Sequence, residues 1–162
     1  FIQFYPADIK AFYMKRHTVI ENELFGEIKR PSAVRGKSKD DPTIQDVVKS
    51  IKLNFTNPDI KHSDEENYFD AKARAEKILA FLSARTEENI LVVTHGEILR
   101  MILSVVAFGS DVTPEIYNRF KQTFIPFNTG ISKIQYDLSF GLNPAGWYVL
   151  AWNDHAHLGE VE

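Results

Sequence analysis

The sequence predicts one α/β domain, in which a mainly parallel sheet flanked by helices carries an antiparallel hairpin at its C-terminal edge. Three observations predict this fold class: helical patterns on both sides of a short strand pattern, a continuous apolar run at residues 90–93, and a period of two after residue 130. The 162 residues suffice for one hydrophobic core and not for two. We therefore treat residues 1–162 as a single domain.

Two helices are predicted in the first half of the chain. Residues 44–55 have apolar side chains at helical spacing, with Thr43 as the cap and Asn57-Pro58 as the stop. A capping-box pattern of Ser63 and Glu66 precedes a second helix, whose charged face includes Arg74. The apolar stripe of this helix consists of Tyr68, Ala71, Ala75, Ile78, Leu79 and Leu82.

The segments around these helices are less regular. Residues 1–18 mix apolar and basic side chains without a clean period and are expected to be partly helical. Residues 26–42 are rich in turn-forming and charged residues, which predicts an irregular exposed segment.

The second half of the chain predicts a strand, two helices and a hairpin. Residues 90–93 read as a strand buried on both faces, followed by Thr94-His95-Gly96 and an apolar helix that ends at Gly109. Thr113-Pro114-Glu115 predicts the capped start of a helix to about residue 124. Residues 131–138 alternate, and residues 147–152 follow a glycine-rich turn as the second strand of a hairpin.

Composition restricts the class of partner. The net charge of −3 lacks the basic excess that nonspecific binding to nucleic acid or to membrane surfaces needs. There is no cysteine, no apolar run of membrane-spanning length and no leader pattern. We expect a cytoplasmic protein with a small-molecule or protein partner. His155, His157 and Asp154 resemble metal ligands, but a polar tail after an edge strand explains them better, so no metal is expected.

The most informative position is His95, at the carboxyl end of the predicted strand. Ligands of open α/β sheets bind where a strand turns into a helix. Gly96 lets the backbone approach a ligand, and the amides of a helix N-terminus favour an anion, typically phosphate. An imidazole there can stabilise charge on a phosphoryl oxygen. The alternative is a histidine whose ring is satisfied by backbone groups.

Four segments together resemble a known family. Residues 89–103, Asn-Ile-Leu-Val-Val-Thr-His-Gly-Glu-Ile-Leu-Arg-Met-Ile-Leu, look like the second-histidine motif of the histidine phosphatase superfamily, the phosphoglycerate mutase-like proteins. Residues 24–38, 128–131 and 146–158 are similar to further segments of the family in order and spacing. The resemblance runs from about residue 19 to the end of the chain.

The resemblance implies a phosphatase that acts on a small phosphorylated molecule through a phosphohistidine, with no metal and no organic cofactor. It implies that His95 stabilises the phosphoryl charge, that Glu27 protonates the leaving oxygen and that Gly96 binds the phosphate. The residues expected to border the substrate are Arg30, Lys37 and Asn128.

The sequence also departs from the family pattern. The family's nucleophilic histidine lies in an Arg-His-Gly motif, which this sequence lacks. Arg16-His17-Thr18 has no glycine and lies too close to Glu27, and Lys10 lacks the bidentate fork of the family's second arginine. We therefore expect a chain that lacks the N-terminal segment of the domain and is inactive alone.

Other hypotheses remain open. The chain could be an inactive family member that binds a phosphorylated ligand or a partner protein, or an unrelated α/β domain in which His95 and Glu27 lie far apart. In a family member without its first strand, residues 90–93 would present an unpaired edge. Such a chain is expected to form a homodimer through that edge, to fill the slot with residues 1–14, or to be poorly soluble.

Overall fold

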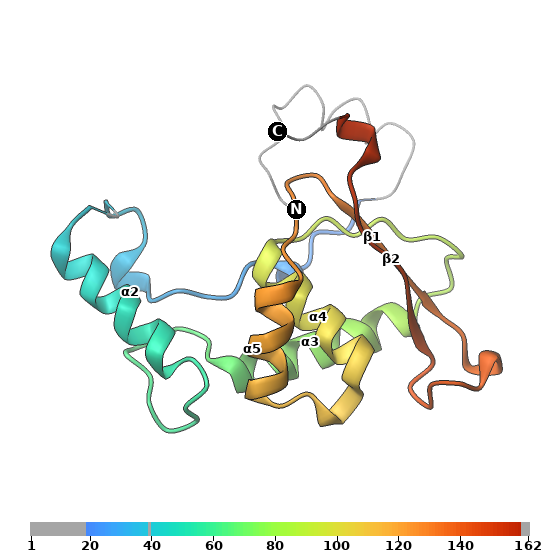
Figure 1. The fold of residues 1–162 in the computed structure, drawn as a ribbon, viewed down its shortest axis with the longest axis horizontal. Coiled ribbons are helices and arrows are strands. Elements are labelled where there is room, and N and C mark those ends of the chain that lie inside the picture. The colour runs from blue at the N-terminus through green and yellow to red at the C-terminus, as the bar shows by residue number, and fades with distance from the viewer. Residues whose placement is uncertain (1–18, 39, 160–162) are drawn as a thin grey trace.

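The computed structural model describes residues 19–38 and 40–159. Three helices, α3 (Tyr68–Ser83), α4 (Gly96–Phe108) and α5 (Pro114–Thr123), pack together, while α2 (Pro42–Asn54) lies to the left in Figure 1. The strands β1 (Ile131–Tyr136) and β2 (Trp147–Asp154) form a hairpin on the other side. The expectations for residues 1–18, including Lys10 and Arg16-His17-Thr18, fall outside the described residues.

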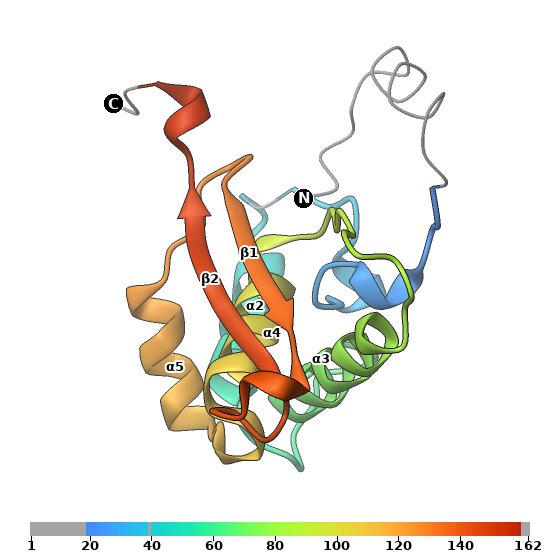
Figure 2. The same cartoon turned by 90° about the vertical axis from the view of Figure 1, so that its right-hand side faces the viewer.

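The core is built around α4. This helix is apolar on nearly every side, as expected for a helix covered by neighbours in several directions. Figure 2 shows the hairpin crossing α4, with α5 on one side and α3 on the other. The predicted stripe of α3 is confirmed, because its first five members are buried and Leu82 packs against them. The buried cluster joins Tyr68, Ala71, Ala75, Ile78 and Leu79 of α3 to Ile98, Met101, Ile102, Val105 and Val106 of α4 and to Val112, Tyr117 and Trp147.

Two of the three predicted helix caps are wrong by a few residues. Asp41, not Thr43, caps α2, because Pro42 takes the first helical position and the Asp41 carboxylate accepts from the Thr43 amide. Asn67 caps α3 in a reciprocal pair with Asp70, because Ser63 and Glu66 make other contacts. The cap of α5 is confirmed, since the Thr113 side chain accepts from the Ile116 amide.

The predicted hairpin is confirmed. β1 and β2 are antiparallel, with Ile134 opposite Val149 and Tyr136 opposite Trp147. Trp147 is buried against the α4 core and Ile134 packs beside it, so one face of the hairpin covers the helices. Among the described residues, this two-stranded sheet is the only one.

The predicted buried strand at residues 90–93 is wrong. These residues form no ladder, and Ile90, Leu91 and Val93 are exposed, Leu91 by 88%. A strand requires a neighbour that accepts and donates its backbone hydrogen bonds, and β1 pairs with β2 alone. A mainly parallel sheet is therefore not found in the described part of the chain, which is α/β with helices and one antiparallel hairpin.

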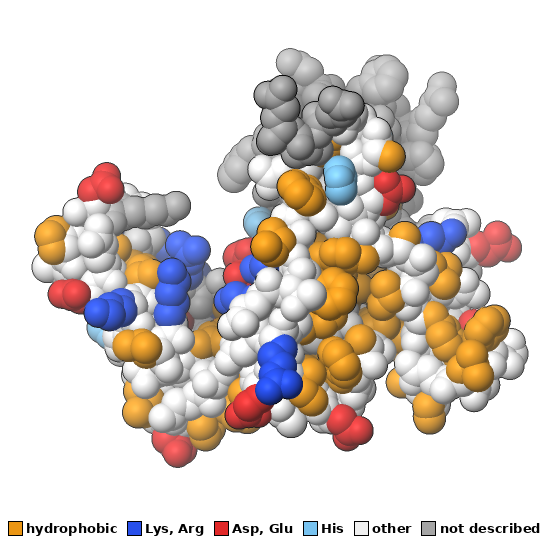
Figure 3. All heavy atoms as spheres, viewed as in Figure 1, with side chains coloured by type: hydrophobic (Ala, Val, Ile, Leu, Met, Phe, Trp, Pro, Cys, Tyr) orange, Lys and Arg blue, Asp and Glu red, His pale blue; other side chains and the backbone are white. Residues whose placement is uncertain are grey.

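The surface is mixed in character. Figure 3 shows apolar side chains interspersed with charged ones on the face that it displays. No helix within the described ranges is both long and apolar enough to cross a membrane.

Candidate functional site

The N-terminus of α4 is the centre of the site. His95 is the N-cap residue in an extended conformation, with φ −110° and ψ 162°, and its side chain does not cap the helix. The first intrahelical bond runs from the Leu99 amide to the His95 carbonyl, at 2.9 Å. The amides of residues 96–98 therefore have no acceptor within the helix, and together with the helix dipole they favour a negative group.

The imidazole of His95 is half-buried and makes no hydrogen bond to any residue that the structure describes. Both of its ring nitrogens are therefore available to a ligand. The neighbouring Thr94 is buried, and its hydroxyl donates to the Phe25 carbonyl at 2.7 Å. That bond fastens the entry of α4 to the short 3-10 helix η1 (Glu23–Phe25).

Glu27 lies at the same helix end as His95. Its carboxylate accepts from the Ile98 amide at 3.2 Å and from the Glu97 amide at 3.4 Å. A third amide, that of Ile28, donates to it at 2.9 Å. The structure thus brings together two side chains that are far apart in the sequence. The Glu27 carboxylate therefore lies where the amides of the helix N-terminus would bind an anion. Its two hydrogen bonds to these amides are long.

Arg74 holds the segment that carries Glu27. Its guanidinium donates to both carboxylate oxygens of Glu66, at 2.7 and 2.6 Å, and to the carbonyls of Leu24 and Gly26, each at 2.7 Å. The side chain is only 13% exposed. Arg74 was predicted on the charged face of this helix, and the structure shows that its side chain is mostly buried by the segment that carries Glu27. Its partner Glu66 lies before the helix begins, and no helical spacing relates the two residues.

The acidic residue in the first turn of α4 points elsewhere. The Glu97 carboxylate pairs with Arg100 and Lys121 and accepts from the hydroxyl of Tyr117. Burial, and then the charge of Glu97, raises the pKa of Tyr117 above its ordinary value, so this hydroxyl stays protonated and can donate. Because its charge is compensated on the α5 side, Glu97 does not oppose an anion at the helix end.

The loop at residues 125–130 borders the helix end. A Cβ on Gly96 would lie 3.4 Å from the ring of Pro126, which is ordinary contact, so sterics do not require glycine there. Asn153 holds the loop, because its amide group accepts from the Phe127 amide and donates to the Ile125 carbonyl. Asn128 is exposed at the turn of this loop.

The other two predicted substrate contacts lie elsewhere. Arg30 and Lys37 line a hollow beside α2 whose lining includes neither His95 nor Glu27. The structure therefore separates these predicted residues into a helix-end group and a group near α2.

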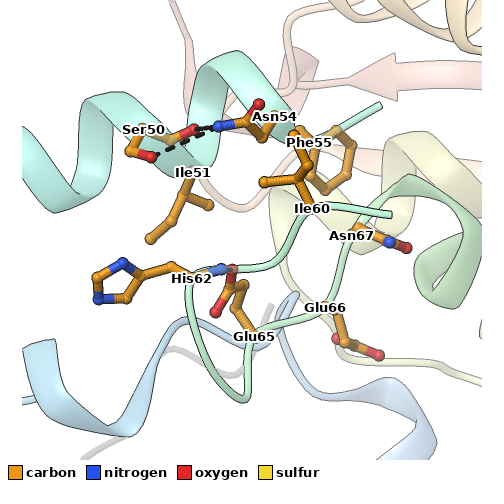
Figure 4. Close-up of a pocket in the computed structure, with 9 residues that line it drawn as sticks. All are labelled: Ser50, Ile51, Asn54, Phe55, Ile60, His62, Glu65, Glu66 and Asn67. Atoms are coloured by element: carbon orange, nitrogen blue, oxygen red, sulfur yellow. Dashed lines mark hydrogen bonds between the residues drawn. The ribbon is translucent and has the colours of Figure 1, made fainter. Parts of the chain in front are cut away.

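A second cavity lies apart from His95 and Glu27 and is too small for a substrate. Figure 4 shows it between the end of α2 and the segment before α3, with His62 and Glu65 in its wall. Its volume of about 10 Å³ has room for about one water molecule. The buried Glu65 carboxylate accepts from the amides of His62 and Ser63, and so stabilises its own loop.

The C-terminal histidine tail has local contacts. His155 Nδ1 lies 2.8 Å from the Asn153 carbonyl oxygen, and its ring lies 4.8 Å from that of Phe127. Within the described ranges, no three side chains of His, Cys, Asp or Glu gather in a way that could hold a metal ion.

Comparison with known proteins gives one result. The family model of the histidine phosphatase superfamily (branch 1) matches residues 25–155, well over half of the chain. No curated protein and no solved structure matches the chain significantly. The matched range contains His95, Glu27 and the loop at residues 125–130.

Proposed function

Because the chain belongs to the histidine phosphatase superfamily, we propose that it hydrolyses a small phosphomonoester through a phosphohistidine. One observation supports this most: the unbonded imidazole of His95 and the carboxylate of Glu27 lie at one helix N-terminus. The helix supplies amides for the phosphoryl oxygens, the imidazole stabilises their charge, and the carboxyl group protonates the leaving oxygen.

The proposed reaction has two steps. A histidine attacks phosphorus while the bond to the leaving oxygen breaks, and the Glu27 carboxyl gives its proton to that oxygen. Water then attacks phosphorus while the P–N bond to the histidine breaks, the Glu27 carboxylate takes the proton that the water loses, and inorganic phosphate leaves the regenerated histidine. The phosphoryl group would take over the amides of Glu97 and Ile98, whose bonds to Glu27 are long. This exchange frees the carboxyl group beside the substrate.

The nucleophile of this reaction is not identified within the chain. The 162 residues contain no Arg-His-Gly sequence. This observation favours a second candidate function, in which the same helix end binds a phosphorylated ligand or partner without turnover. The two candidates share the binding site and differ in whether phosphate is released.

Hydrolysis of p-nitrophenyl phosphate tests the proposal. We would assay the 162-residue chain and a chain that includes any residues encoded upstream of Phe1. If the longer chain is active, His95→Ala is expected to lower its kcat by about 10²- to 10³-fold, because one stabilising donor is lost. Glu27→Gln is expected to lower kcat by about 10²- to 10⁴-fold.

Two outcomes would contradict the proposal. Activity that survives both substitutions would show that the helix end is not the catalytic site. The binding function would be established instead if neither chain hydrolyses the substrate, if the wild-type chains bind phosphate, and if His95→Ala abolishes this binding. His62→Ala is the matched control, since this exposed histidine lies outside the helix end.

A further inference from the structure

Three cationic side chains surround the hollow beside α2. Arg30, Arg35 and Lys37 line it together with the apolar side chains of Val34, Ile44 and Val48, and its volume is about 210 Å³. No carboxylate contributes to this lining. Figure 3 shows Lys and Arg side chains gathered on this part of the surface, next to α2.

None of the three cations forms an ion pair with a residue that the structure describes, although the charge of Lys37 helps to lower the pKa of Asp41. The neighbouring carboxylates have other partners. Asp41 accepts from the amide and hydroxyl of Thr43 at the start of α2. Asp64 accepts from Ser32 and pairs with Lys29, contacts that hold its pKa well below the ordinary value. Like charges repel one another, so an anion in the hollow would lower the electrostatic energy of this cluster.

The floor of the hollow indicates what the anion is attached to. Ile44 and Val34 are buried, and Val48 continues the same apolar surface. Ligand sites combine apolar walls with a few polar groups that fix orientation. A bare inorganic ion would leave this apolar surface unused.

We propose that the hollow binds an anionic group on an apolar body, such as a carboxylated or sulfonated ring. As a statement about substrate, this inference rests on the proposed function: the preferred phosphomonoester carries a second anionic group remote from the phosphate. Arg30 follows Glu27 by three residues, so their Cα atoms lie at most about 11 Å apart. This separation is within the length of a small molecule that carries a phosphate at one end and a second anionic group at the other.

Binding of 1-naphthalenesulfonate, which is fluorescent and cannot be hydrolysed by a phosphatase, tests the site without any need for turnover. The triple variant Arg30→Ala, Arg35→Ala, Lys37→Ala is expected to raise its Kd by about tenfold or more, because hydrogen bonds to charged groups are lost. The control triple variant Lys49→Ala, Lys52→Ala, Lys77→Ala removes the same charge from exposed positions outside the hollow. It is expected to change Kd less than about twofold.

Two further ligands separate the contribution of the anionic group from that of the apolar ring. Neutral 1-naphthalenemethanol and inorganic sulfate should each bind at least about tenfold more weakly than the sulfonate, because each lacks one half of the recognised structure. His95→Ala should leave sulfonate binding unchanged. Equal losses in the two triple variants, equal binding of the neutral ring, or loss of binding in His95→Ala would each overturn the site. Circular dichroism of every variant checks that the helices are retained.

Kinetics connect the site with the proposed function. In an active chain, 4-carboxyphenyl phosphate should have a higher kcat/KM than phenyl phosphate, and the Arg30, Arg35, Lys37 triple variant should abolish this preference. Sulfonate binding without any hydrolysis would contradict the proposed function and leave the site standing. Hydrolysis without a preference for 4-carboxyphenyl phosphate would contradict only the role of the hollow in substrate selection.

Discussion

Gly130 occupies a position where no side chain has room. A Cβ there would lie 2.0 Å from Oδ1 of Asn153, the atom that accepts from the Phe127 amide. Asn153 itself has a positive φ of 49°, which asparagine tolerates better than most residues. The loop beside the helix end is therefore held by one amide side chain that needs a glycine opposite it.

Gly130→Ala is expected to lower the free energy of unfolding by about 1–3 kcal/mol, because the new methyl group displaces the Asn153 side chain from its loop contacts. Urea denaturation followed by circular dichroism measures the change. In an Asn153→Gly background the clash with this side chain is absent and only a 3.2 Å contact with the Phe127 carbonyl oxygen is left, so the same substitution should cost less.

Gly96→Ala is the control for this prediction. A Cβ at Gly96 makes only ordinary contact with Pro126, so its effect should stay within about 1 kcal/mol. Equal losses at the two glycines would show that crowding against Asn153 is not what restricts residue 130.

The guanidinium of Arg74 links separate elements of the fold. It joins α3 to the backbone around η1 and to Glu66, whose carboxylate also accepts from the Lys29 amide at 2.8 Å. Both charged groups of this pair are mostly buried. The geometry of Glu27 at the helix end thus depends on a helix that contributes no side chain to the proposed chemistry.

Arg74→Ala is expected to lower the free energy of unfolding by about 2–4 kcal/mol, because it leaves the Glu66 charge without its cationic partner and two carbonyls without their donor. Arg74→Lys should recover only part of the loss, since an ammonium group cannot form the same fork. Urea denaturation gives the stability, and the amide NMR shifts of Glu97 and Ile98 report whether Glu27 has left the helix end.

Lys77→Ala on the same helix is the matched control, because this exposed lysine has no ion pair with a described residue. Its effect should stay within about 0.5 kcal/mol. A stability loss in Arg74→Ala without any change at the two amides would mean that the guanidinium stabilises α3 but does not position Glu27.

Residues 90–93 affect the molecule as a whole. Ile90, Leu91 and Val93 are exposed in an irregular segment directly before His95. Exposed apolar segments of this kind pair with other chains. The homodimer therefore stays a prediction, and Ile90, Leu91 and Val93 are the residues expected to form its interface.

Leu91→Lys is expected to shift the 162-residue chain toward the monomer, because a charge in the apolar segment opposes its burial between copies. Analytical ultracentrifugation over a concentration series measures the shift. Leu53→Lys is the control, since Leu53 is 73% exposed on α2, outside the segment. A wild-type chain that is monomeric at every concentration would contradict the prediction.

Much of the local structure could be predicted from the chain. Helical spacing predicted α3 and its buried stripe, a proline and its neighbours predicted the start of α5, and alternation predicted the hairpin. These features depend on residues close in sequence, so local patterns contain them. The caps of α2 and α3 were missed because several polar residues compete near each helix start, and only one of them faces the free amides.

For the site, the sequence by itself determined the residue types, with His95 before a helix and Glu27 in an irregular segment. Only the tertiary structure decided that the Glu27 carboxylate reaches the amides of α4, that Arg74 fixes its segment, and that Arg30 and Lys37 belong to another hollow with Arg35. It also decided that residues 90–93 form no strand in the described chain. The physical reason is the same in each case: hydrogen bonds and ion pairs between distant residues depend on which partners the fold places opposite them, and an apolar run forms a strand only where another strand can pair with it.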